Sequence, residues 1–316
     1  GWRGVMFGSQ AIGAGSVQAR PLATRGGRRS VLRAGSRQSV AARSRSLASV
    51  TSIDEASLRD MSGLLTLDNI RSSLIRQEDT IIFNLIERAQ FAANDPVYVD
   101  GAIAVPGYDA NGRHHSLLEY ALRETEQLHG KMRRYTSPAE HAFFPDSLPP
   151  LALKPIEFDP VLASFNKEIN VNKKIMEVYV DDVVPAIAKP GDDNNYGSAS
   201  MLDVAVLQAL STRIHYGMFV AEAKFREKTK QYTELIKARD SGGIMELLTD
   251  IAVEDRVVER VALKAATFGQ DVVSGSAAPS TNLKISPDAV GSLYRKWIMP
   301  LTKEVEVMYL LRRLEE

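Results

Sequence analysis

Apolar residues recur every three or four positions along most of the chain after Thr66, and no run alternates apolar and polar residues over a useful length. A period near 3.6 residues is typical of α-helices that bury one face, whereas alternation is typical of strands. The pattern therefore predicts an all-α protein, a single multi-helix bundle domain without a β-sheet core. The expected helices cover residues 66–93, 116–135, 170–183, 198–225, 232–239, 244–251, 253–268 and 287–316, the last interrupted at Pro300.

Two segments should lie between helices rather than within them. Residues 137–160 hold six prolines, which exclude a continuous helix or a central strand and predict an ordered wrap or a long loop. Residues 191–200 (GDDNNYGSAS) are a polar turn of the residue types that cap helix starts. Such a start also offers free backbone N–H groups to a carboxylate.

The most informative stretch, residues 208–225, belongs to the predicted helix 198–225, and two cations flank a bare patch of backbone there. Arg213 and Lys224 lie eleven positions and three turns apart on one shoulder of the apolar stripe, with Gly217 between them. Long basic side chains at the edge of a buried helix often only extend to water. The alternative is a clamp for a small anion with two separated acidic groups. The stripe consists of Leu207, Leu210, Ile214, Met218, Ala221 and Phe225.

Other ionic and polar side chains fall at helical spacing on different predicted helices. Asp250 and Glu254 are four residues apart, as are Thr302 and Glu306, so each pair faces one way. Each pair alone fits a solvated helix face. Together with Arg71 and the two central cations, they predict a polar pocket inside a bundle, because buried charges must be paired.

Composition divides the chain into two parts. Residues 1–53 contain nine Arg and nine Ser but no Lys and no carboxylate, and the first acidic residue is Asp54. This composition predicts an organellar transit peptide over residues 1–53, without a folded structure of its own, and a folded domain over 54–316. A basic nucleic-acid-binding arm is the competing interpretation.

The charge and residue types of the folded part exclude several classes of function. Residues 54–316 carry thirty Lys and Arg against thirty-nine Asp and Glu, a net charge of −9, which argues against nucleic-acid and anionic-membrane partners. No apolar run approaches the ~20 residues that cross a bilayer. The chain has no cysteine, and no phosphate-binding loop, nucleophile elbow or zinc-binding helix motif is present. We expect no metal and no cofactor.

Five stretches closely resemble the eukaryotic, all-helical type of chorismate mutase in its plant plastid form. The resemblance extends from about residue 64 to the end of the chain. It implies an isomerase, an intramolecular transferase that rearranges chorismate to prephenate on the way to phenylalanine and tyrosine. It also implies a homodimer that works without a cofactor in the chloroplast stroma. The stretches are LDNIRSSLIRQEDTIIFNLIERAQF (67–91), RRYTSPAEHAFFPD (133–146), PGDDNNYGSAS (190–200), RIHYGMFVAEAKF (213–225) and PLTKEVEVMYLLRRLEE (300–316).

The resemblance also assigns roles at the substrate site. Arg71 and Arg213 bind the two carboxylates of chorismate, and Lys224 donates to its ether oxygen. Glu306 contacts the same oxygen, which requires a protonated carboxyl group with a pKa raised by burial.

Three further residues complete the implied substrate site. Glu254 holds the ring hydroxyl, and Thr302 lines the carboxylate site. Asp250 departs from the family pattern, because a fungal relative has Asn there, so an amide donor could not be conserved although a backbone contact could.

Regulated members of the family bind aromatic amino acids at the dimer interface, where tryptophan activates and tyrosine or phenylalanine inhibits. Met201 replaces a Thr of the fungal relative, which leaves the effector preference open. The central helix begins at this site and carries Arg213 and Lys224, so it lies between regulation and catalysis. The positions that resemble the effector site are Gly197, Ser198, Asn194, Asn195, Arg133 and Arg134.

Two other functions remain alternatives. One is a catalytically silent helical sensor of aromatic amino acids, against which the intact set of ionic residues argues. The other is an organellar helical scaffold, for which the acidic folded part and the lack of an exposed heptad seam give no support.

Overall fold

The computed structural model describes residues 66–108, 114–156, 158–271 and 282–315, so the expected transit peptide at 1–53 lies outside the described residues. Every regular element within these ranges is helical, and β-pairing is limited to isolated bridges between Ala92 and Lys189 and between Gln270 and Leu283. The prediction of an all-α fold is confirmed. None of the helices in these ranges is long and apolar enough to cross a membrane.

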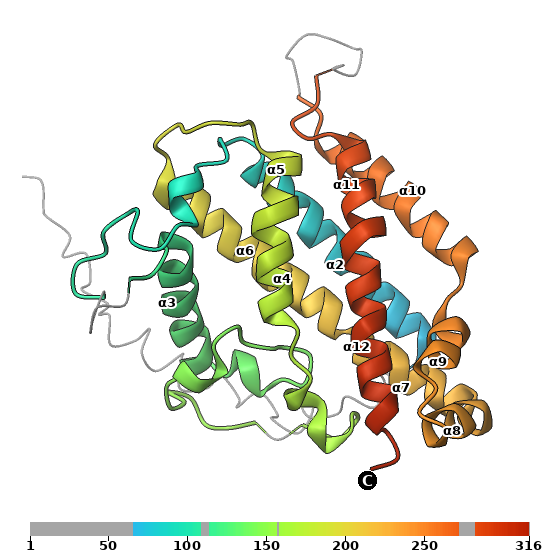
Figure 1. Ribbon diagram of the computed structural model, residues 1–316. Helices are drawn as coiled ribbons and strands as arrows, with labels where there is room; N and C mark the ends of the chain where they lie inside the picture. The colour runs from blue at the N-terminus through green and yellow to red at the C-terminus, as the bar shows by residue number, and fades with distance from the viewer. Residues whose placement is uncertain (1–65, 109–113, 157, 272–281, 316) are drawn as a thin grey trace, which may run out of the picture. The chain divides into compact units, whose positions relative to one another are not determined.

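Eleven α-helices and two π-helical segments build the described part (Figure 1). Short 3₁₀ turns join them at Asp95–Val97, Arg134–Thr136, Pro145–Ser147 and Ser164–Glu168. The helices are α2 (Leu67–Arg88), α3 (Leu117–Lys131), α4 (Asn172–Val178), α5 (Val184–Ile187), α6 (Tyr196–His215), α7 (Gly217–Glu227), α8 (Thr229–Lys237), α9 (Ser241–Leu248), α10 (Ile251–Phe268), α11 (Pro287–Leu293) and α12 (Met299–Arg312).

The central helix predicted from the sequence corresponds to α6 and α7, which are separated by Tyr216 alone. The chain keeps its direction there, because the Tyr216 amide bonds to the Thr212 carbonyl and the Phe219 amide bonds to the Tyr216 carbonyl. Helices α2, α3, α4 and α12 all contact α6, and α12 also contacts α7 (Figure 1). The α6–α7 pair is therefore the element around which the other helices pack.

Helix α2 starts as predicted but ends earlier. Its N-cap Thr66 accepts the Asn69 amide, whereas its last residue is Arg88 rather than residue 93. The Arg88 guanidinium is fully buried. It donates to the carbonyls of Phe91 at 3.4 Å, Ala92 at 3.0 Å and Ala93 at 2.9 Å. A buried charge that needs these carbonyls competes with continued helix, so the predicted end at 93 is wrong.

The proline-rich segment is a wrap, as predicted, and α3 holds it in place. Glu126 is 1% exposed, and its carboxylate accepts the backbone amides of Phe143 at 2.7 Å and Phe144 at 3.0 Å. Helix α3 ends at Lys131, four residues before the predicted end, because Arg133 adopts a left-handed conformation with φ of 71°.

The last helix is interrupted near Pro300 in a specific way. A π-helical segment, Tyr294–Ile298, joins α11 to α12, and Pro300 occupies the first turn of α12, where its missing N–H costs little. A second π-helical segment, Tyr179–Val183, joins α4 to α5. The extra backbone length of each segment re-aims the side chains that follow it.

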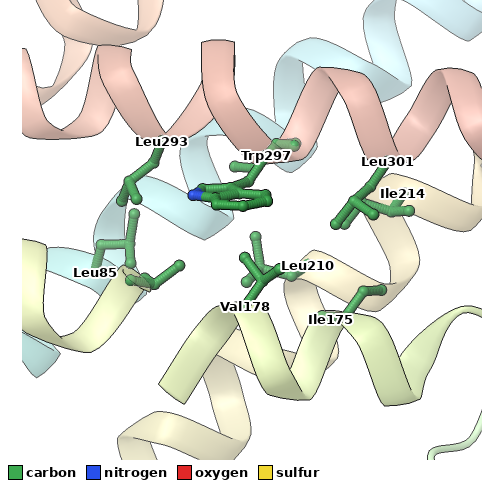
Figure 2. A pocket seen from close by; sticks show the side chains of 10 residues that line it. Leu85, Ile175, Val178, Leu210, Ile214, Leu293, Trp297 and Leu301 are labelled. Carbon is green, nitrogen blue, oxygen red and sulfur yellow. The ribbon is translucent and has the colours of Figure 1, made fainter. Parts of the chain in front are cut away.

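A small apolar gap lies where these segments face α2 and α6 (Figure 2). Its volume is about 10 Å³, enough for about one water molecule, and no polar partner awaits such a molecule. It is a packing gap of the core and carries no chemistry. Its lining is Leu85, Ile175, Val178, Val183, Leu210, Ile214, Leu293, Trp297, Ile298 and Leu301.

Candidate active site

A cavity of about 390 Å³ collects ionic side chains from five helices. All seven residues that the sequence assigned to substrate line it, although they lie up to 235 positions apart in the chain. They come from α2, α6, α7, α12 and the start of α10. The residues are Arg71, Arg213, Lys224, Asp250, Glu254, Thr302 and Glu306.

Arg213 is the most deeply placed cation of the cavity. It is 6% exposed and donates through Nη1 to the Thr302 hydroxyl oxygen at 3.3 Å. That hydroxyl in turn donates to the Ile298 carbonyl at 2.6 Å, which fixes its orientation. The buried Nε of Arg213 has no hydrogen-bond partner among the described residues. A buried guanidinium with a free donor is suited to an anionic ligand.

Lys224 and Glu306 face each other across the cavity. Their closest atoms, Nζ and Oε2, are 3.7 Å apart, which makes an ion pair but is too long for a hydrogen bond. The Lys224 ammonium donates instead to the Leu248 carbonyl at 2.9 Å. Glu306 is 5% exposed, and its Oε2 has no hydrogen-bond partner among the described residues.

Burial raises the pKa of Glu306, and this effect outweighs the nearby positive charges of Lys224, Arg213 and Lys303, each of which lowers it. A carboxyl group with a raised pKa keeps its proton to higher pH and can then donate a hydrogen bond. The expected raised pKa of Glu306 therefore agrees in direction and in physical cause with its burial.

Gly217 allows α12 to lie close to the α6–α7 junction. A Cβ at this position would lie 2.9 Å from the Thr302 carbonyl oxygen, 3.0 Å from Thr302 Cγ2 and 3.3 Å from Glu306 Cγ. The sequence suggested that this glycine provides clearance between the two cations. In the structure the clearance is for the α12 backbone, which brings Thr302 and Glu306 into the cavity.

Two ionic residues of α2, Arg71 and Glu78, lie in different environments. The Arg71 side chain is 71% exposed at the mouth of the cavity, and among the described residues its single ion pair is a 3.5 Å contact with Asp68. Glu78 is 1% exposed, with Arg260 at 2.7 Å and Lys264 at 3.1 Å. Arg71 is thus available to a ligand, whereas Glu78 joins α2 to α10.

Asp250 and Glu254 lie at the N-terminus of α10. The Asp250 side chain caps this helix, because its Oδ1 accepts the Val253 amide at 3.1 Å. Capping explains why a carboxylate serves here, since Asp and Asn cap equally well. Glu254 Oε1 accepts from the Lys303 ammonium at 2.9 Å.

Lys303 and Glu227 are the ionic residues of the cavity that the sequence did not reveal. Lys303 follows Thr302 on α12, and its partner Glu254 lies 49 positions away. Helical spacing within α12 gives no signal for this pair, because both partners must be placed by the packing of α12 against the rest of the bundle.

The proposed effector residues do not meet within one chain. Gly197, Ser198, Asn194 and Asn195 are exposed at the start of α6. Arg134 donates to Gln208 on α6 at 2.8 Å, and ten residues of helix separate Gln208 from Ser198, about 15 Å at 1.5 Å per residue. Arg133 donates to the Lys154 carbonyl at 2.9 Å.

The fold and the cavity define a class of protein. Four cations and a buried, hydrogen-bond-competent carboxyl group surround a space of small-molecule size in an all-helical domain. Such a site can bind a small organic dianion and direct donors at one of its oxygens.

Comparison with known proteins identifies the family. The sequence profile described as "Chorismate mutase type II" matches residues 195–307. "Chorismate mutase 1, chloroplastic" of Petunia hybrida is 49% identical over 252 residues, which cover 79% of this chain and 76% of the relative. The Arabidopsis thaliana protein of the same name is 49% identical over 265 residues, 81% of this chain and 76% of the relative.

Solved structures agree with this result. Aro7p chorismate mutase from Candida albicans, in complex with L-Trp, superposes with a TM-score of 0.75 at 42% identity and covers 84% of this chain and 96% of that one. AtCM1 with phenylalanine bound in its allosteric site gives a TM-score of 0.73 at 49% identity, over 81% and 99%. The chain belongs to the chorismate mutase family and is an isomerase of this all-helical type.

Proposed function

We propose that the chain rearranges chorismate to prephenate in the cavity between α2, α6, α7, α10 and α12. The observation that carries this proposal is the pair formed by Lys224 and Glu306, a cation and a buried carboxyl group that are 3.7 Å apart and not hydrogen-bonded to each other. A ligand oxygen that lies beside this pair, at hydrogen-bond distance from both groups, can accept a hydrogen bond from each.

The reaction itself needs little chemistry from the protein. A [3,3]-sigmatropic rearrangement breaks a C–O bond and forms a C–C bond in one step, without a nucleophile or an obligatory proton transfer. An enzyme accelerates it by holding the compact diaxial conformer and by stabilising the charge that develops on the ether oxygen. Arg213, Thr302 and Arg71 bind the two carboxylates in this scheme and so select that conformer.

Lys224 and Glu306 then act on the ether oxygen. The Lys224 ammonium donates one hydrogen bond, and the protonated carboxyl group of Glu306 donates a second one. Both bonds strengthen as negative charge grows on the oxygen, so they favour the transition state over the bound substrate. Glu254 accepts a hydrogen bond from the ring hydroxyl, and Asp250 shapes this end of the cavity by capping α10.

The proposal is tested by measuring the consumption of chorismate, which is monitored as the loss of its diene absorbance in the ultraviolet. Lys224→Ala should lose about 3 kcal/mol or more of transition-state stabilisation, measured as kcat/KM. Lys174→Ala is the matched control, because Lys174 forms an exposed pair with Glu304. Near-wild-type activity of Lys224→Ala, or equal losses in both variants, would refute the assigned mechanism.

We also propose that aromatic amino acids regulate the enzyme at an interface between two copies. Relatives are described with tryptophan, phenylalanine and tyrosine bound, the last two in an allosteric site. Arg134 bonds to Gln208, which lies about 15 Å from Ser198 along α6 in one chain. A homodimer that sets Arg133 and Arg134 of one copy against Gly197 and Ser198 of the other would complete the site, with the helix start receiving the effector carboxylate.

Residues 1–53 are proposed to direct the protein to a plastid, where it acts in the stroma. Their Arg- and Ser-rich composition supports this, as do relatives that are named chloroplastic. Fusion of residues 1–53 to a fluorescent protein should give plastid fluorescence, whereas a fusion of residues 54–316 should not.

A further inference from the structure

Lys303 forms an ion pair with Glu254 in the cavity, and the proposed function gives this lysine no role. Lys303 Nζ lies 2.9 Å from Glu254 Oε1, with side chains that are 21% and 27% exposed. Lys303 lies between Thr302 and Glu306 on α12, and Glu254 lies in the first turn of α10. The pair therefore joins the two helices that close one end of the cavity.

The geometry of the pair leaves half of the carboxylate for a ligand. Lys303 bonds to Oε1 of Glu254, so the rotamer of Glu254 is held while Oε2 keeps its lone pairs for a ligand hydroxyl. An unheld glutamate side chain would have to lose rotamer freedom on binding, which weakens affinity. The lysine supplies this order before the substrate arrives.

The charge of Lys303 matters because the ligand is a dianion. Glu254 and Asp250 both line the cavity and would repel a second pair of negative charges. An ammonium at 2.9 Å from Glu254 offsets much of this repulsion. A carboxylate can then serve as a hydrogen-bond acceptor in a site built for an anion.

We propose that Lys303 is a positioning residue, which holds Glu254 ready to accept the hydroxyl of the substrate and offsets its charge. This inference rests on the proposed function, because it concerns the subsite for the ring hydroxyl of the same substrate.

A second consequence concerns Glu306 on the same helix. The charged and titratable groups that face Glu306 are Lys224 on α7, Arg213 on α6, Tyr232 on α8 and Lys303 on α12. The lysine at 303 lowers the pKa of Glu306 against the larger effect of burial. Loss of Lys303 should therefore raise that pKa further and move the alkaline fall of activity to higher pH.

Steady-state kinetics on the full chain test the proposal. Lys303→Met keeps most of the length of the side chain and removes its charge. It should raise KM for chorismate about tenfold and change kcat less, because Glu254 is no longer held ready to bind the ring hydroxyl of the substrate. Lys303→Arg should restore KM to within about threefold of wild type, since it keeps the charge near Glu254. The pH profile of kcat should extend to higher pH in Lys303→Met alone.

A double-mutant cycle with Glu254→Gln separates positioning from general attraction of the substrate. If Lys303 acts through Glu254, Lys303→Met should add less than about twofold to KM in the Glu254→Gln background. A full tenfold effect in that background would overturn the proposal, as would an unchanged KM and pH profile in Lys303→Met. Circular dichroism and thermal melting check that each variant folds, and Lys303→Gln is the second charge-removing variant, with the same expected rise in KM, if the Met variant does not fold.

Wild-type activity in the same assay distinguishes a failure of the proposed function from a failure of the role of Lys303. A wild-type chain that does not consume chorismate would refute the proposed function. An active wild type whose KM and pH profile are unaffected by Lys303→Met would refute the role of Lys303 alone.

Discussion

Two buried ionic clusters attach to the same α6–α7 element, and they differ in how completely their polar atoms are paired. In the first, the Asp203 carboxylate receives Arg88 Nε at 2.5 Å, the Tyr179 hydroxyl at 2.6 Å and the Tyr98 hydroxyl at 2.9 Å. The other donors of Arg88 reach carbonyls and Tyr98. In the second, the cluster of Arg213, Lys224, Thr302 and Glu306, buried Nε and Oε2 atoms lack hydrogen-bond partners within the described part of the chain.

The difference shows which cluster serves the fold and which serves a ligand. A saturated network contributes to stability because it leaves no buried polar atom unpaired. An unsaturated one costs stability in the free protein and regains it when a ligand supplies the missing partners. Both clusters contain a buried cation and a buried carboxyl group and include side chains of α6–α7, so the completeness of pairing is the informative quantity.

Removing Arg88 should have the largest effect on the free energy of unfolding, because it disrupts the fully paired cluster. Arg88→Met strands the Asp203 carboxylate in the core and should lower the free energy of unfolding by about 3–5 kcal/mol. Urea unfolding at a fixed protein concentration, followed by circular dichroism, measures this. Arg295→Met, which removes an exposed pair with Asp255, should cost under about 1 kcal/mol. Similar losses in the two variants would contradict the role given to the Arg88 network.

Closing the gap at Gly217 should affect both stability and activity. Gly217→Ala places a Cβ against the Thr302 carbonyl and should cost about 1–3 kcal/mol by overpacking. The displaced α12 should also reduce kcat/KM by about tenfold or more, since small shifts of catalytic groups are costly. Gly242→Ala on α9 is the control, because its Cβ makes only an ordinary contact at 3.5 Å. Unchanged kinetics in Gly217→Ala would show that α12 does not need this close approach.

Replacing Glu306 by a residue that does not titrate should change the pH dependence of activity in the incompletely paired cluster. The raised pKa of Glu306 means that its protonated form, and the activity that depends on it, is present at low pH and is lost as pH rises through that pKa. Glu306→Gln donates through an amide at every pH, so activity should be kept at neutral pH and fall less on the alkaline side. Profiles of kcat from acidic to alkaline pH measure this, and identical profiles for the two proteins would exclude a protonated carboxyl group.

The raised pKa of Glu306 should also make the free energy of unfolding depend on pH. A native pKa above that of the unfolded chain means that the native state binds more protons, so stability decreases as pH rises from the unfolded value through the native one. Glu306→Gln removes this dependence. The variant should therefore gain stability relative to wild type as pH increases across that interval, measured by urea unfolding at each pH.

The proposed effector site should give the smallest effect on the basal rate. Arg134→Ala and Ser198→Asp should each abolish the response to aromatic amino acids while basal kcat changes by about twofold or less. If the site is shared between two copies, a mixed dimer of the two variants contains one intact site. Subunit exchange should then restore part of the response, whereas a site within one chain predicts no restoration.

Local sequence determined most of the helices, and their boundaries show where it was insufficient. Thr66 and Ser116 cap α2 and α3 at the positions where the sequence predicts these helices to begin, because a cap depends on residues three positions apart. The ends of the same helices were predicted four or five residues too late. Their true ends depend on a buried Arg88 and on the backbone of Arg133, and both are set by contacts outside the helix.

The candidate site divides in the same way. Helical spacing places side chains on particular helix faces, so it predicts which ionic residues can face a pocket. It does so for the stripe of α6–α7, for Asp250 with Glu254 and for Thr302 with Glu306. Only the tertiary structure decided which of them meet. It paired Glu254 with Lys303, gave Glu78 to Arg260 and saturated Asp203 with Arg88, each across at least 49 residues. Periodicity fixes directions around one helix axis, whereas contacts between helices depend on how their axes pack.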